Sequence, residues 1–239
     1  MKAPADDGRL RPEFISAISH ELRSPLNVIL GYNELLRDQT FGPLNAEQED
    51  ALQRIGDNAH LLLERLNCIL EYSRIQAGDL EVLIHPIRIG EVLRAAADSV
   101  QAIAHEREAA VAFELRNEAP AIELQTDSEK LVAALAQVLA NAFKFTDKGV
   151  VSLTARLADA GVELVITDTG IGIAPEICGR IFEPFFKVDG VGRKGFRDFG
   201  LGLYIARSYC ERLGGEIEVA SEPGRGSTFR LRLPLRLVE

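Results

Sequence analysis

Residues 19–26, with the sequence SHELRSPL, place a histidine where it could act as a nucleophile. A neutral imidazole nitrogen, with an unperturbed pKa of about 6.5, can take a phosphoryl group at physiological pH. Glu21 follows His20 directly, and Ser24 comes one helical turn later. A histidine on a helix is more often an ordinary surface residue, so the neighbouring segments must decide its role.

Three glycine-bearing segments further along the chain could let a ligand approach the backbone. They are DTGIGI (168–173), GLGL (200–203) and EPGRGSTF (222–229). Glycines such as Gly170 and Gly172 permit close approach and sharp turns that side chains would block, and backbone amides that open a helix can bind phosphate. Each segment alone is compatible with an ordinary turn.

His20 lies on the first of two predicted helices. Apolar residues step by threes and fours over 14–36 and again over 52–69, as in helices with one buried stripe. The first stripe consists of Phe14, Ile18, Leu22, Pro25, Ile29, Tyr32 and Leu36, and the second of Leu52, Ile55, Ala59, Leu62, Leu66 and Ile69. His20 is predicted to face solvent, opposite the first stripe.

The two helices are predicted to form a hairpin. Gly42 and Pro43 break the chain between them, and Asn45 can cap the second helix. Pro25 should bend the first helix near His20. Two helices alone bury too little surface to be stable, so we expect the hairpin to pair with a second copy as a four-helix bundle.

After residue 78 the pattern changes to mixed helices and strands. We predict a helix over Ile89–Glu106 and another that is capped by Asp127. The predicted strands are Val111–Leu115, Val150–Leu157, Val162–Thr167, Glu216–Ala220 and Thr228–Leu235, of which the last four form two hairpins. We therefore expect two domains, 10–78 and 79–239, the second an α/β sandwich with helices on one face of a mixed sheet.

Composition excludes several classes of function. The net charge of −9, from 27 basic and 36 acidic residues, argues against binding to nucleic acid or to an anionic membrane surface. We expect the three widely spaced cysteines, Cys68, Cys178 and Cys210, to be reduced, and His60, His85 and His105 to be structural. No apolar run approaches the roughly 18 residues of a membrane helix, so we expect a cytoplasmic piece, on its own or within a longer membrane-bound receptor.

In order and spacing, these segments resemble the transmitter core of the two-component sensor histidine kinases. SHELRSPL resembles the phosphoacceptor box, VLANAFKFT (138–146) the N box, and DTGIGI the G1 box. IFEPFFKVD (181–189) resembles the F box, GLGL the end of the G2 box, and EPGRGSTF the last glycine box. The resemblance covers roughly residues 10–237 and implies a dimeric hairpin followed by a Bergerat ATP-binding fold.

The resemblance implies that His20 accepts a phosphoryl group from ATP and that Glu21 orients the ring and takes its proton as general base. The group would then pass to an aspartate on the receiver domain of a response regulator. Ser24 stands where a hydroxyl or amide positions water for dephosphorylation. Threonine is commoner there, so phosphatase activity is open.

The resemblance also implies a Mg-ATP site. Asn141 would ligate Mg²⁺ through its amide oxygen, because this ion takes most of its ligands from phosphates and water. Lys144 would contact phosphate, and Asp168 would accept a hydrogen bond from the adenine amino group. The other expected contacts are Gly170, Gly172, Gly200, Leu201, Gly202 and Thr228, with Lys187, Arg193 and Lys194 from a lid over Lys187–Asp198.

Two positions depart from the family pattern and keep alternatives open. Asp198-Phe199-Gly200 replaces the usual Gly-Thr-Gly, which places a carboxylate near the expected phosphates unless it points outward. Gln137 stands where related ATPases carry a glutamate base, which favours transfer to His20 over hydrolysis. The alternatives are a catalytically weak signalling scaffold, a phosphatase-biased homologue of the same fold, and a stand-alone ATPase.

Overall fold

The computed structural model describes residues 12–107, 110–158, 161–188 and 199–236, with the backbone alone described over 12–20 and 106–107. The chain divides into two compact units, Met1–Leu80 and Glu81–Glu239. Across the described ranges, no helix is both long enough and apolar enough to cross a membrane.

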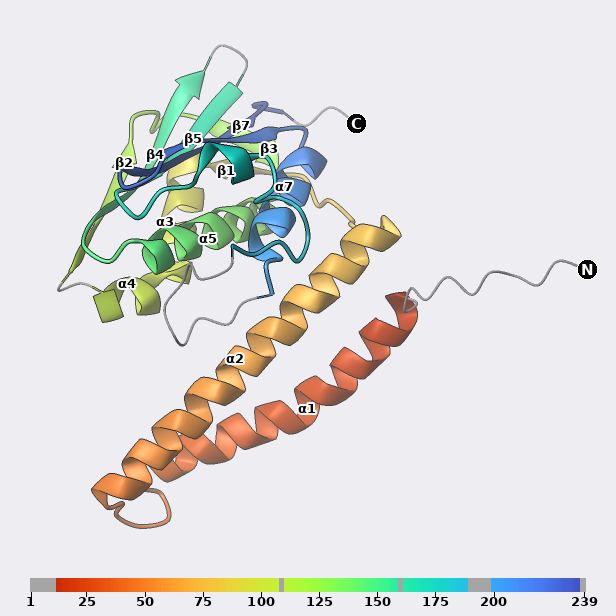
Figure 1. Ribbon diagram of the computed structural model, residues 1–239. Helices are drawn as coiled ribbons and strands as arrows, with labels where there is room; N and C mark the ends of the chain where they lie inside the picture. The colour runs from red at the N-terminus through yellow and green to blue at the C-terminus, as the bar shows by residue number, and fades with distance from the viewer. Residues whose placement is uncertain (1–11, 108–109, 159–160, 189–198, 237–239) are drawn as a thin grey trace, which may run out of the picture. The chain divides into compact units, whose positions relative to one another are not determined.

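The first unit is a helical hairpin, as predicted (Figure 1). Helix α1 spans Pro12–Arg37, with Pro25 inside it, and α2 spans Ala46–Ala77. Asn45 begins α2 with a capping box. Its side chain accepts the Gln48 amide at 2.9 Å, while the Gln48 side chain accepts the Asn45 amide at the same distance.

The end of α2 is fixed by its own backbone. Gly78 takes the left-handed conformation, at φ 72°, and donates its amide to the carbonyl of Ile75. The next amide, of Asp79, donates to the carbonyl of Arg74 at 3.1 Å. The hydrogen bonding of α2 therefore extends through residue 79.

The surface that the two helices bury against each other contains only part of the predicted stripes. The hairpin core is built on Leu26, Leu30 and Ala59, with Leu63 and Leu66 packed around them. The stripe residues that stay largely exposed are Leu22 (46 %), Ile29 (48 %), Tyr32 (59 %), Ile55 (48 %) and Leu62 (49 %). Ala59 and Leu66 of the predicted α2 stripe lie in this core. Leu26 and Leu30 of α1 lie outside the predicted stripe, because α1 carries two apolar faces and periodicity does not tell which of them α2 covers.

A buried polar contact fixes the register of the hairpin. Asn33 is only 5 % exposed and donates its side-chain amide to the carbonyl of Leu52 at 2.8 Å. Its Oδ1 occupies the space beside Gly56, where an added Cβ would lie 2.9 Å away. A glycine inside a helix costs about 1 kcal/mol relative to alanine, so Gly56 makes room for Asn33 at a local cost.

The second unit contains a five-stranded mixed sheet with strand order β2-β4-β5-β7-β6. Strands β2 and β4 are parallel, and the other neighbours are antiparallel. The strands are β2 (Val111–Asn117), β4 (Gly149–Ala158), β5 (Gly161–Asp168), β6 (Glu216–Glu222) and β7 (Gly226–Leu233). A separate antiparallel pair, β1 (His85–Arg88) and β3 (Glu123–Thr126), was missed by the sequence analysis.

Helices cover one face of this sheet, as predicted (Figure 1). They are α3 (Ile89–Ser99), α4 (Gln101–Arg107), α5 (Ser128–Phe145), the short α6 (Pro175–Cys178) and α7 (Gly202–Arg212). The helix expected over Ile89–Glu106 is in fact two, because Val100 leaves helical geometry and ends α3 by donating its amide to the carbonyls of Ala97 and Asp98. The core lies between helices and sheet, where Leu135, Val138 and Leu164 are completely buried.

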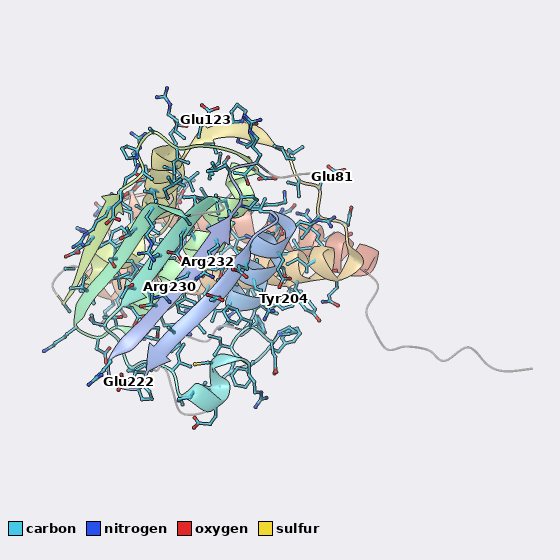
Figure 2. The ribbon with its side chains drawn as sticks, turned by 90° about the horizontal axis from the view of Figure 1, so that it is seen from above. Glu81, Glu123, Tyr204, Glu222, Arg230 and Arg232 are labelled. Atoms are coloured by element: carbon cyan, nitrogen blue, oxygen red, sulfur yellow. The ribbon has the colours of Figure 1, made fainter. Side chains whose placement is uncertain are left out.

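The other face of the sheet carries polar and charged side chains. Glu163 of β5 is 5 % exposed and accepts hydrogen bonds from Arg156 of β4 at 2.5 Å and from Arg232 of β7 at 3.1 Å. Burial alone would raise the pKa of Glu163, but these two arginines outweigh it and lower that pKa. Figure 2 shows Arg230 and Arg232 on β7, two residues apart and therefore on the same face.

Replacing Gly56 by alanine tests the register contact. The new methyl would overlap Asn33 Oδ1, and the cost of this overlap should exceed the gain in helix propensity. We therefore expect Gly56→Ala to lower the free energy of unfolding by about 1 kcal/mol net. Urea denaturation followed by circular dichroism measures this.

The matched control is Gly31→Ala in α1, where nothing lies within 4 Å of the added Cβ. That change should stabilise the chain, and Gly56→Ala should also stabilise it once Asn33 is replaced by alanine. Equal destabilisation by Gly56→Ala with and without Asn33 would contradict the overlap.

Candidate functional site

A cavity of about 550 Å³ lies in the second unit. It is formed by the last turns of α5, the end of β5, the loop that follows, α6, residues 181–188, the start of α7 and β7. Much of its wall is apolar, made by Ile171, Ile173, Ala174, Ile177, Ile181, Pro223 and Phe229. Such a wall suits a flat, apolar ring system.

Helix α5 brings two polar side chains to this cavity. Its other side is held rigidly in the core, and its first turn is capped by Asp127, which accepts the Lys130 amide at 3.1 Å. Asn141 and Lys144 follow on the opposite end and both line the cavity. The Lys144 ammonium lies 4.7 Å from the centre of the Phe145 ring.

Asp168, at the end of β5, is the buried acid of the cavity. It is 5 % exposed and accepts the Gly170 amide at 2.8 Å, and Ser227 donates to it through both backbone and hydroxyl. Burial raises its pKa above the ordinary value, and these hydrogen bonds offset the rise only in part. A buried carboxylate against an apolar wall is suited to accept a hydrogen bond from an N–H group of a ring ligand.

Close backbone approaches shape the rest of the cavity. Gly172 has φ 69°, and a Cβ there would lie 2.0 Å from the carbonyl oxygen of Glu222. Gly202 opens α7, whose cap residue Leu201 makes no side-chain capping bond. The first amides of α7 are therefore oriented to bind an anion such as phosphate.

Most of the residues predicted for nucleotide binding meet at this cavity. Those that line it are Asn141, Lys144, Asp168, Gly172, Lys187, Gly200 and Gly202. Gly170 donates its amide to Asp168, and Leu201 is a core residue with 1 % exposure. Arg193, Lys194 and Asp198 lie outside the described residues.

The predicted nucleotide contact at Thr228 is not where the structure places this residue. Its hydroxyl lies 3.3 Å from that of Thr167, on the face of the sheet away from the helices, and it does not line the cavity. The preceding residue, Ser227, pairs with Asp168 in the strand register and does line the cavity. The sequence analysis missed Ser227 because neighbouring strand residues face opposite sides, and only the pairing of β5 with β7 tells which one faces the ligand.

The other predicted site residues belong to the first unit. His20 lies within α1, but its side chain is outside the described residues. Glu21 and Ser24, in the turn that follows, are exposed on the same helix. Each unit therefore presents one part of the expected chemistry.

Two known protein families match this chain. Residues 10–78 match the His Kinase A (phospho-acceptor) domain, and residues 126–237 match the Histidine kinase-, DNA gyrase B-, and HSP90-like ATPase family. The first match covers the hairpin with His20, and the second covers the cavity.

Individual proteins give the same picture. The chain is 33 % identical to the histidine protein kinase DivJ of Caulobacter vibrioides, covering 95 % of this chain and 38 % of DivJ, and 33 % identical to the autoinducer 2 sensor kinase/phosphatase LuxQ of Vibrio parahaemolyticus, covering 95 % and 27 %. Among solved structures, full-length ShkA in complex with AMPPNP matches with a TM-score of 0.77 and 33 % identity, over 94 % of this chain and 46 % of ShkA.

A mycobacterial structure matches over the whole of its own length. The sensor histidine kinase MprB is 30 % identical, with a TM-score of 0.53, over 65 % of this chain and 100 % of that one. The chain belongs to the sensor histidine kinases, and it corresponds to their transmitter core. It spans less than half the length of the curated relatives named above.

The contrast between Ser227 and Thr228 is testable by titration. Ser227→Ala removes a donor that favours the charged form of Asp168, so the pKa of Asp168 should rise further above its ordinary value. Any stability that Asp168 contributes is present below that ordinary value and is lost as pH rises through the raised one, so the loss should move to higher pH. Carboxyl NMR across a pH series measures the pKa, and urea denaturation at the same pH values measures the stability.

Thr228→Val is the matched control, because its hydroxyl contacts Thr167 on the other face. It should leave the Asp168 titration unchanged. An equal shift from both variants would contradict the assignment of Ser227.

Proposed function

We propose that this chain transfers the γ-phosphoryl group of Mg-ATP to His20 and then passes it to an aspartate on the receiver domain of a response regulator. The observation that carries the proposal is the cavity with Asp168 at one end and the uncapped start of α7 at another, in the same chain as SHELRSPL. The chain spans only part of the length of its relatives, so the proposal does not cover any input region.

The base end of ATP is proposed to lie against the apolar wall. Adenine has an exocyclic amino group, and the Asp168 carboxylate would accept one of its hydrogens. The aliphatic wall and Phe229 would cover the ring. Gly170 and Ser227 hold Asp168 in place for this contact.

The phosphate end is proposed to lie between α5 and the start of α7. Lys144 and Lys187 would offer charge, and the backbone at Gly200 and Gly202 would offer amides. The described residues contain no cluster of three His, Cys, Asp or Glu side chains fit to hold a metal ion. Mg²⁺, which would neutralise phosphate charge, is therefore proposed to enter with the nucleotide and to take one protein ligand, the Asn141 amide oxygen.

The chemical step is proposed to need little from the protein beyond positioning. A ring nitrogen of His20 would bond to the γ-phosphorus as the bond from that phosphorus to the bridging oxygen of ADP breaks. Glu21, exposed beside His20 in sequence, would accept the proton from the other ring nitrogen. The phosphohistidine would then be the donor to the receiver aspartate.

We further propose that residues 10–78 dimerise. The apolar residues that the hairpin leaves exposed, such as Leu22, Ile29 and Leu62, form a surface that one chain does not cover. A second copy would bury them in a four-helix bundle. Residues 79–239 would be the ATP-binding domain of each copy.

Hydrolysis of the phosphoryl group on the partner's aspartate is a second candidate activity. LuxQ is a sensor kinase/phosphatase by name, and Ser24 is exposed one turn beyond His20 with a hydroxyl that could position water. The same dimer would then both phosphorylate and dephosphorylate its receiver domain.

Labelling with γ-³²P-ATP and Mg²⁺ tests the kinase. The intact chain should gain an acid-labile, base-stable label, and His20→Gln should reduce it to background, because the accepting nitrogen is gone. His60→Gln, the same change at an exposed histidine of α2, should keep the label. Absence of label on the intact chain, or persistence of label in His20→Gln, would contradict the proposal.

Asp168→Asn tests the adenine contact. We expect ATP to bind about 10- to 100-fold more weakly by calorimetry, since hydrogen bonds to a charged group contribute about 1.5–3 kcal/mol. Thermal stability at pH 7 should fall only slightly, because burial disfavours the ionised form of Asp168 and the amide oxygen can still accept from Gly170, whereas the amide nitrogen cannot accept from the Ser227 donors.

Asp98→Asn makes the same change at an exposed site on α3 and should leave ATP affinity unchanged. Wild-type ATP affinity in Asp168→Asn would rule out the proposed base end.

A further inference from the structure

One hydroxyl joins the apolar wall of the cavity to its buried acid. Ser221 lies near the end of β6, and its oxygen accepts the Ile173 amide at 2.8 Å. The same hydroxyl donates to the Gly226 carbonyl at 2.8 Å and lies 3.0 Å from the Ser227 oxygen. Ser227 in turn donates to Asp168. The contacts of one side chain therefore reach from the loop after β5 to the carboxylate.

The strand register brings the two serines together. Ser221 is the partner of Ser227 across β6 and β7, and Ser227 is the partner of Asp168 across β7 and β5. Partners in an antiparallel pair point to the same face of a sheet. Asp168 and Ser227 line the cavity, whereas Ser221 does not. Ser221 therefore contacts residues of the cavity wall without being part of that wall.

The Ser221 hydroxyl has a donor or acceptor position for each of these contacts. A hydroxyl carries one proton and two acceptor positions. The proton is directed to the Gly226 carbonyl, which can only accept. The Ile173 amide takes one acceptor position, and the other faces the Ser227 hydroxyl. Alanine at this position would leave the half-buried Ile173 amide without its acceptor.

The start of the loop after β5 is held by backbone bonds, and its end is held by Ser221. The Ile171 amide donates to the Phe145 carbonyl at 3.1 Å, and the Ile171 carbonyl accepts the Gly224 amide at 2.7 Å. Two residues later, the Ile173 amide donates to Ser221. Both isoleucines line the cavity. Replacement of Ser221 should therefore release the wall at Ile173, while the backbone bonds of Ile171 remain.

We propose that Ser221 is a positioning residue for the base end of the nucleotide, which holds the wall at Ile173 and the Ser227 hydroxyl in the arrangement that receives the ring. It acts through its neighbours and does not contact the ligand itself. This inference rests on the proposed function and deepens it, because it assigns a determinant of adenine affinity outside the cavity.

The proposed phosphate end is built from different elements, the last turns of α5 and the start of α7. None of the contacts of Ser221 described above involves either helix. Loss of the hydroxyl should therefore weaken binding of the base and leave binding of phosphate unchanged. General damage to the fold would weaken both.

Ser221→Ala in the whole chain tests this separation. Calorimetry with Mg²⁺ and ATP should show binding about 3- to 10-fold weaker than in the wild type, as expected for the loss of one hydrogen bond. Inorganic tripolyphosphate, which has the phosphates of ATP without the base, should bind both proteins equally in an NMR titration with Mg²⁺. The Ile173 amide should exchange its hydrogen faster in Ser221→Ala.

Two further variants serve as controls. Ser152→Ala makes the same change in β4, where Ser152 is the partner of Thr167 and lies on the face away from the helices. It should keep the wild-type ATP affinity and Ile173 exchange. Ser221→Thr keeps the hydroxyl and suits a strand, so it should bind ATP within about twofold of wild type.

The inference is overturned if Ser221→Ala binds ATP as tightly as the wild type, or if tripolyphosphate loses affinity by the same factor as ATP. Equal loss of ATP affinity in Ser221→Thr and Ser221→Ala would also refute it. If no version of the chain binds ATP, the proposed function fails instead. The positioning role is then judged by hydrogen exchange, and equal exchange of the Ile173 amide in wild type and Ser221→Ala would contradict it.

Discussion

Helix α5 is the element on which the organisation of the second unit depends. One side of it is completely buried between the sheet and the neighbouring helices, so the helix has one rotational setting. That setting turns Asn141 and Lys144 into the cavity and presents Asp127 and Ser128 to the incoming chain. The cavity and the segment that precedes β1 therefore contact the same rigidly packed helix.

The local sequence was sufficient to predict the elements whose signals are local. The cap residues Asn45 and Asp127, the hairpin of β4 and β5, and the glycine-bearing loop after β5 all follow from short-range chemistry. The break at Val100 was missed because no glycine or proline marks it. The four-residue strands β1 and β3 were missed because strands this short carry too few residues for a period-two pattern.

Errors about the site arose where the answer depends on pairing between distant segments. Thr228 and Ser227 are adjacent, yet only the register of β7 against β5 decides that Ser227 meets Asp168. The apolar faces of α1 pose the same difficulty. The sequence shows that residues such as Leu22 and Ile29 are apolar at helical spacing, but which partner covers them is a matter of tertiary and quaternary contact.

Gln137 bears on whether the proposed site would hydrolyse ATP. A Cβ added at Gly202 would lie 2.5 Å from Gln137 Oε1, so this amide lies against the start of α7, one turn before Asn141 on α5. An amide cannot take a proton from water as a carboxylate can. We infer that ATP bound here is hydrolysed slowly and that its γ-phosphoryl group is transferred mainly to His20. On this proposal the rate of phosphoryl transfer depends on how often His20 reaches the bound nucleotide.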